Sequence, residues 1–140
     1  MNERISLNLF YMGFFSAVIA ILVTAGAFYY RMEDQVKEYL QEESRVITQV
    51  YSYIEEPESL APFASDIIRI TLIDSLGHVL FESEKESAEM GNHLNRPEIQ
   101  MALETGTGES FRFSSTLETD VYYFAQKLPD GHVLRLSMRK

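Results

Sequence analysis

Histidine is the first residue type to consider for chemistry, because it can act as a base, bind a metal or change charge near neutral pH. The three histidines, His78, His93 and His132, lie far apart in the sequence, and none belongs to an HExxH pair. The sequence contains no GxSxG nucleophile motif, no Walker loop and no cysteine. We therefore expect no catalytic residues, no cofactor and no histidine-based metal site in this chain.

An acidic run offers a second kind of chemistry, since Ca²⁺ and Mg²⁺ prefer several carboxylate ligands. The run consists of Glu82, Glu84, Glu86 and Glu89. A solvated loop explains the same residues without any ion, because charged side chains favour water. Divalent-cation sensing on this acidic surface is therefore kept as an alternative function.

The most specific hypothesis for ligand binding rests on two segments, 92–98 and 112–116. In a strand, Arg112 and Ser114 share one face, so a cation and a hydroxyl would point together at the carboxylate of a small ligand. The alternative is that Glu98 pairs with Arg112 or Arg96 and simply fixes a helix to the sheet. The candidate ligand-binding residues are Arg96, Glu98, Arg112, Ser114 and Tyr123.

These side chains must be positioned by a sheet with flanking helices. Segments rich in β-branched residues predict strands, and Gly77 and Pro129-Asp130-Gly131 mark turns between them. Pro97 suits the first turn of a short helix that Gly106 ends. The strands are expected at residues 66–74, 78–82, 109–116, 120–128 and 132–138, and the short helix at 96–104. This order predicts an α+β fold with a five-stranded antiparallel sheet, the long amino-terminal helix on one face and the middle segment on the other.

The charge distribution separates a membrane segment from an acidic domain. Of 21 acidic and 12 basic residues, only Glu3, Arg4 and Arg31 precede residue 32. Residues 5–30 contain no Asp, Glu, Lys or Arg, and as a helix they would extend about 39 Å, enough to cross the ~30 Å hydrocarbon core. The acidic remainder argues against nucleic acid as a partner, because phosphate binding requires Lys and Arg.

Two questions about the apolar segment stay open on its sequence alone. Ala25-Gly26-Ala27 resembles a signal-peptide cleavage site, although the apolar run is longer than a typical signal peptide and favours an uncleaved anchor. Charge does not decide the orientation, because basic residues flank both ends. Small residues recur at steps of four and three along one helix face, where a second helix could approach closely. They are Gly13, Ala17, Ala20, Thr24 and Ala27.

A second helical segment is expected at residues 32–56, ending at Glu56-Pro57. Its apolar stripe either covers the sheet of the domain or forms a coiled coil with a second copy. The stripe comprises Val36, Leu40, Ile47, Val50 and Ile54. The expected organisation is therefore a tail and transmembrane helix at 1–31, a juxtamembrane helix at 32–56 and a PAS-like domain at 57–140.

Several blocks together carry a resemblance to a known family. They are RITLIDSLGHVLF (69–81), NHLNRPEI (92–99), GTG (106–108), RFSSTL (112–117), YFA (123–125) and VLRL (133–136). In this order they resemble the extracytoplasmic single-Cache-like sensor domain of PhoR-type bacterial histidine kinases, over about residues 1–140.

The resemblance implies a domain outside the bacterial cell membrane on a single membrane span, as part of a two-component system. We expect signalling by repacking of helices in a homodimer, with lipid around residues 5–30. The signal would be an unknown small ligand or an extracytoplasmic protein, and a protein-interaction module without a ligand is the alternative. No phospho-acceptor histidine box or ATP-binding motif occurs. We therefore expect the chain to be the sensory part of a longer kinase, or a truncated form of one.

Overall fold

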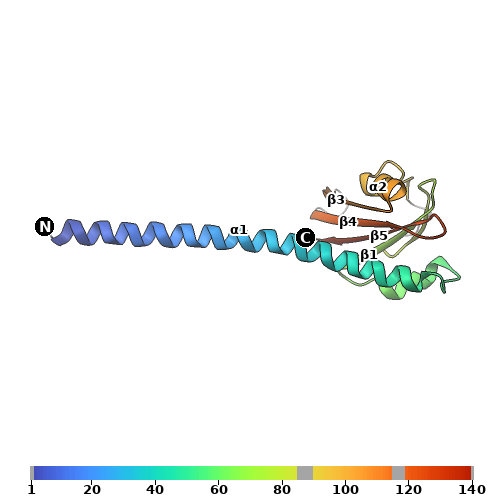
Figure 1. Ribbon diagram of the computed structural model, residues 1–140, viewed down its shortest axis with the longest axis horizontal. Coiled ribbons are helices and arrows are strands. Elements are labelled where there is room, and N and C mark those ends of the chain that lie inside the picture. Colours follow the sequence, from blue (N-terminus) through green and yellow to red (C-terminus); the bar gives the residue numbers. More distant parts are fainter. Residues whose placement is uncertain (1, 85–89, 115–118, 140) are drawn as a thin grey trace. The chain divides into compact units, whose positions relative to one another are not determined.

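The structure, a computed structural model, describes residues 2–84, 90–114 and 119–139, with side chains from residue 5 onward. It is an α+β protein with a long amino-terminal helix and a five-stranded sheet (Figure 1), which confirms the predicted fold class. The elements are α1 (Asn2–Tyr51), the 3₁₀ helix η1 (Pro57–Phe63), β1 (Ile68–Ile73), β2 (Val79–Glu82), α2 (Pro97–Thr105), β3 (Thr107–Ser114), β4 (Thr119–Lys127) and β5 (Val133–Arg139).

The sheet has the strand order β2-β1-β5-β4-β3, and every neighbouring pair is antiparallel. All five strands overlap the segments predicted for them, and the predicted residues 115 and 116 lie outside the described part of the chain. The tight turns need a left-handed backbone that glycine adopts without strain, and Gly77 and Gly131 supply it with φ of 89° and 90°. The antiparallel pairing of all neighbouring strands confirms the predicted antiparallel sheet.

Each face of the sheet is covered by a different helix. Leu40 and Ile47 of α1 are fully buried in the larger core cluster, with apolar side chains of β1, β4 and β5. On the other face, Ile99 and Ala102 of α2 form a smaller cluster with Ala125. Figure 1 shows the carboxyl-terminal part of α1 and α2 on opposite sides of the strands. The apolar stripe of the second helical segment thus covers the domain's own sheet.

Helix α1 contains two segments of different character. Residues 1–35 form one compact unit and residues 36–140 another. In the first unit the large apolar side chains are exposed, for example Phe10, Phe15 and Leu22, each at 60% or more. By length and composition this helix is able to cross a membrane.

The helix ends earlier than predicted. Its last residue is Tyr51 rather than Glu56, and the chain continues in tight turns in which Tyr53 and Ile54 donate backbone hydrogen bonds three residues back. Such i to i−3 bonds are the tighter geometry that often follows an α-helix. The proline at position 57 begins η1 instead of terminating α1.

Candidate functional site

Glu98 is the centre of a buried group of polar side chains between α2 and the sheet. Pro97 at the start of α2 directs the chain so that Glu98, in the first turn, faces β3 and is fully buried. Its carboxylate accepts hydrogen bonds from Arg112 Nη1 at 2.7 Å and Nη2 at 3.0 Å. Ser110 Oγ donates at 2.8 Å and Arg135 Nη1 at 3.4 Å. One carboxylate therefore binds groups from two strands.

A glycine permits this close approach of α2 to β3. A Cβ atom at Gly108 would lie 2.2 Å from the carbonyl oxygen of Glu98 and 2.8 Å from Met101 Cβ. No side chain fits at such distances, since real Cβ atoms do not approach other atoms so closely. Gly108 thus places the first turn of α2 within reach of the strand hydroxyl and guanidinium groups.

Tyr123 lies beside two guanidinium groups. The Arg112 Cζ atom is 4.1 Å from the centroid of the Tyr123 ring, and the Arg135 Cζ atom is 5.2 Å from it. Both distances fall within the range of cation–π attraction. The ring of Tyr123 therefore stabilises one buried cation, Arg135, and one half-buried cation, Arg112, on the same face of the sheet.

A second buried carboxylate, Glu82, joins this group from β2. It accepts a hydrogen bond from Arg69 Nε at 2.6 Å and another from Thr71 Oγ1 at 2.9 Å. Thr71 Oγ1 in turn accepts a bond from Arg135 Nη2 at 3.1 Å. We call the set the α2-side polar layer. It comprises Arg69, Thr71, Glu82, Glu98, Ser110, Arg112, Tyr123 and Arg135.

The α2-side polar layer contains more guanidinium than carboxylate groups. Glu98 and Glu82 are its acids, whereas Arg69, Arg112 and Arg135 are its bases. Arg135 is 3% exposed, and its Nε atom is buried with no hydrogen-bond partner in the part of the chain described. A buried donor without a partner is costly. Glu84 Oε2 also lies 3.9 Å from Arg69 Nε at the edge of the layer, so Arg135 is the guanidinium group with the least complete set of partners.

The ionisation behaviour of these groups follows from their contacts. Burial alone would raise the pKa of Glu98, but its hydrogen bonds from Arg112 and Ser110 outweigh burial and hold the pKa below its ordinary value. Burial lowers the pKa of Arg135. Burial also lowers the pKa of His93, with a further contribution from the positive charge of Arg135. Glu98 is therefore ionised and His93 favours its neutral form.

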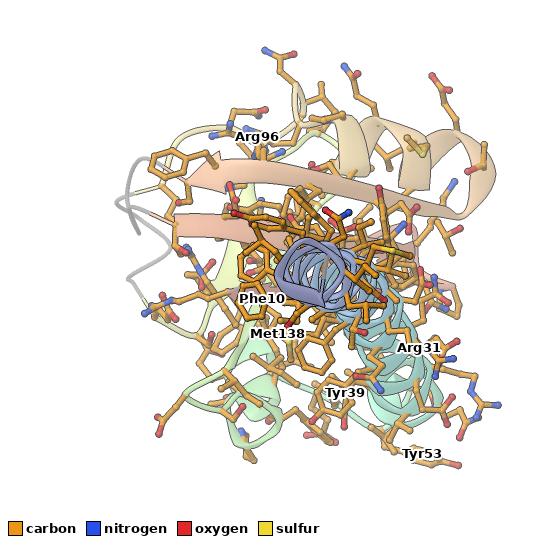
Figure 2. The ribbon with its side chains drawn as sticks, turned by 90° about the vertical axis from the view of Figure 1, so that its left-hand side faces the viewer. Phe10, Arg31, Tyr39, Tyr53, Arg96 and Met138 are labelled. Carbon is orange, nitrogen blue, oxygen red and sulfur yellow. The ribbon has the colours of Figure 1, made fainter. Side chains whose placement is uncertain are left out.

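The five predicted ligand residues are only partly brought together. Glu98, Arg112 and Tyr123 meet in the α2-side polar layer. Arg96 is the N-cap residue of α2, on the other side of the sheet from Tyr53 (Figure 2), and Ser114 is the last residue of β3. The pairing of Glu98 with Arg112, given as the alternative to ligand binding, is present. A ligand role for the five residues stays a prediction.

The sequence reasoning missed Arg135, Thr71 and Ser110. Arg135 and Thr71 come from β5 and β1, which are adjacent only because of the strand order, and their pairing depends on register. One signal was present, because Arg135 interrupts the apolar strand VLRLSMR at a position expected to be buried. A charged residue inside a buried strand indicates a partner or a function.

The acidic run does not form one surface. Glu82 is 7% exposed and binds Arg69 and Thr71, so it is not a solvated residue as expected, because its position in β2 places it beside these two side chains of β1. Glu84 lies 3.3 Å from Arg139 Nη2. Glu86 and Glu89 lie outside the described residues. Within residues 2–84, 90–114 and 119–139, no group of three or more His, Asp or Glu side chains is arranged to hold a metal ion.

No family model matches the chain, and no curated protein matches it. A solved structure of the YkuI protein of Bacillus subtilis, which has an EAL domain and is in complex with c-di-GMP and calcium, is similar at 16% identity. It is matched over 74% of this chain and 32% of that chain with a TM-score of 0.54. This likeness shows a shared fold and no more.

A second solved structure is described as the extracellular domain of a histidine kinase, rpHK1S-Z16. It is 18% identical, with a TM-score of 0.41, over 69% of this chain and 37% of that chain. The chain thus spans about a third of the length of each of these two proteins. The PhoR-type single-Cache-like resemblance stays a prediction.

Proposed function

We propose that the chain is a membrane-anchored, extracytoplasmic sensory domain, and that its parent is a two-component histidine kinase. The observation that carries the proposal is that one continuous helix contains both the apolar segment and the face buried in the domain. Residues 5–30 of α1 carry no charge, and Leu40 and Ile47 of the same helix are fully buried against the sheet. A change in packing at Leu40 or Ile47 acts directly on the helix that enters the membrane.

The signalling step is a shift between two packing arrangements. A ligand shifts such an equilibrium only by its differential affinity for the two states. The α2-side polar layer is the proposed place of this difference, because Arg135 is buried there and its Nε atom has no hydrogen-bond partner among the described residues. A small anionic ligand would compete with Glu98 for Arg112, with Arg96, Ser114 and Tyr123 as the remaining candidate contacts.

The proposed signalling unit is a homodimer that contacts through the small residues of the apolar segment. The residues of this face are Gly13, Ala17, Ala20, Thr24 and Ala27. Glycine and alanine allow close approach of two helix backbones in lipid, where van der Waals packing drives association. The hydroxyl of Thr24 donates to the Ala20 carbonyl at 2.8 Å, which satisfies this polar group within its own helix.

The proposal is tested by enlarging that face. In the full chain in bacterial membranes, the double variant Ala17→Leu with Ala20→Leu should lose most of its dimer crosslinking. The matched control is Val18→Phe with Leu22→Phe, which adds bulk to the opposite face and should crosslink like the unaltered chain. Equal crosslinking in all three proteins would show that the small-residue face of the membrane helix has no role in dimerisation.

A protein-interaction module without a small ligand is the second candidate. It is supported by the bidentate pairing of Arg112 with Glu98, which already occupies the guanidinium that a ligand would use. Titration of the full chain with a series of small carboxylates separates the candidates. Saturable binding that is lost on Arg112→Met supports the ligand sensor, and heats no larger than dilution favour the protein partner.

A further inference from the structure

A cavity of about 540 Å³ lies at the end of α1, apart from the α2-side polar layer. It is formed by the last turns of α1, the segment that follows, one residue of β1 and the turn between β4 and β5. Its lining residues are Thr48, Tyr51, Ser52, Ile54, Glu55, Glu56, Pro57, Leu72, Pro129, Asp130 and His132. The volume falls in the range of cavities that bind small organic molecules.

The walls of this cavity combine apolar and acidic groups. Leu72 is buried in the sheet, and Ile54 and Pro129 add apolar surface. Three lining residues are carboxylates, Glu55, Glu56 and Asp130, and the lining contains no Lys or Arg. The cavity is thus complementary to a molecule with an apolar body and a positive charge.

The Asp130 carboxylate is held in place by neighbouring groups. Its Oδ1 atom accepts the backbone N–H of His132 at 3.0 Å, and its Oδ2 atom accepts the hydroxyl of Tyr51 at 2.9 Å. His132 Nδ1 lies 3.0 Å from Oδ2 and 3.1 Å from the Tyr51 hydroxyl oxygen. Burial and the adjacent Asp130 raise the pKa of Tyr51, so its hydroxyl remains a donor. The acceptor is therefore oriented before any ligand arrives, which lowers the cost of binding.

A bare metal ion fits this cavity poorly. Among the described residues, no three His, Asp or Glu side chains are close enough to share one ion. A primary ammonium instead requires only one or two carboxylates, and its alkyl chain gains from contact with Leu72 and Ile54. The Tyr51 ring offers a further attraction for a cation.

We infer that this cavity is a binding site for a small organic amine, whose ammonium group pairs with Asp130 and whose alkyl part lies against the apolar wall. This site is separate from the proposed anion-responsive layer and does not depend on it. Tyr51 is the last residue of α1. An amine that pairs with Asp130 therefore acts on the end of the helix that covers the sheet.

The test is calorimetric titration of the full chain in zwitterionic lipid nanodiscs with 1,4-diaminobutane as the probe. Asp130→Asn removes the charge and keeps the shape, and its affinity should fall at least about tenfold, as expected for a lost charged hydrogen bond. Asp120→Asn is the matched control, because it removes one charge from an exposed position on β4, and it should bind like the unaltered chain. Thermal unfolding confirms that each variant folds.

A second variant keeps the inference testable if Asp130→Asn does not fold. Glu55→Gln with Glu56→Gln changes two exposed lining residues and should weaken binding several-fold. If Asp120→Asn lost as much affinity for 1,4-diaminobutane as Asp130→Asn, the inference would be overturned. Such a result would show that the amine is attracted to the acidic protein as a whole. The absence of saturable binding to 1,4-diaminobutane would also overturn it, as would displacement of the amine by Ca²⁺ at equal concentration.

Discussion

Glu98 shows how much one side chain contributes to the contact between α2 and the sheet. A fully buried carboxylate is tolerated only when charged donors compensate its lost hydration, and here Arg112, Arg135 and Ser110 do so. Arg112 and Arg135 share this one ionic partner, and they keep it only while Glu98 is ionised. Stability and the proposed ligand response therefore depend on the same group.

Replacement of Glu98 should be strongly destabilising. Glu98→Gln removes the ionic partner of the buried Arg135 and of the half-buried Arg112, and should lower the free energy of unfolding by about 3 kcal/mol. Urea denaturation of the full chain in detergent, followed by tyrosine fluorescence, measures the change. Glu104→Gln is the control on the exposed side of the same helix and should change stability by less than about 0.5 kcal/mol. Equal stability of the two variants would contradict the description of the layer.

His93 should make stability depend on pH in mildly acidic solution. Its pKa is lowered in the folded protein by burial and by Arg135, so the unfolded chain binds the proton more tightly. Stability contributed by neutral His93 is complete above the unfolded pKa of about 6.5 and is lost as pH falls through the folded pKa. His93→Gln should flatten this part of the stability curve between pH 7 and pH 5. An unchanged slope in the variant would show that other groups control it.

At the scale of elements, the contact between α2 and β3 depends on the absence of a side chain at Gly108. Gly108→Ala places a methyl group against the backbone of the first turn of α2 and should cost about 1–3 kcal/mol of stability, as other overpacking changes do. Gly91→Ala is the matched control, because nothing lies within 4 Å of a Cβ atom there. If Gly108→Ala unfolds at the same urea concentration as Gly91→Ala, α2 does not approach β3 so closely.

The elements were largely predictable, because their signals are local. Alternating β-branched residues, Gly77 and Pro129-Asp130-Gly131 predicted the strands and turns, and Pro97 with Gly106 predicted α2. The end of α1 was predicted too late, because tight turns intervene after Tyr51 and Pro57 begins the next helix. The partners of Glu98 were only partly predictable, since Arg135 reaches it through strand order and register, which no local pattern contains.

At the scale of the whole molecule, one helix contains a segment suited to lipid and a segment suited to a protein core. Exposed side chains such as Phe10 and Leu22 would be costly in water, whereas a bilayer would accommodate them. Leu40 and Ile47, by contrast, are buried against the sheet. Under the proposed function, residues 5–30 cross a membrane and the domain at 36–140 lies on the outer side.

The most direct test of this account is the accessibility of single cysteines in intact bacterial cells that express the full chain. The unaltered chain has no cysteine and serves as the blank. Tyr53→Cys replaces a side chain that is 85% exposed and should react with a membrane-impermeant maleimide in intact cells, whereas Asn2→Cys should react only after lysis. Both proteins should remain in the membrane fraction. Labelling of Asn2→Cys but not Tyr53→Cys in intact cells, or release of a shortened Tyr53→Cys domain into the soluble fraction, would contradict the account.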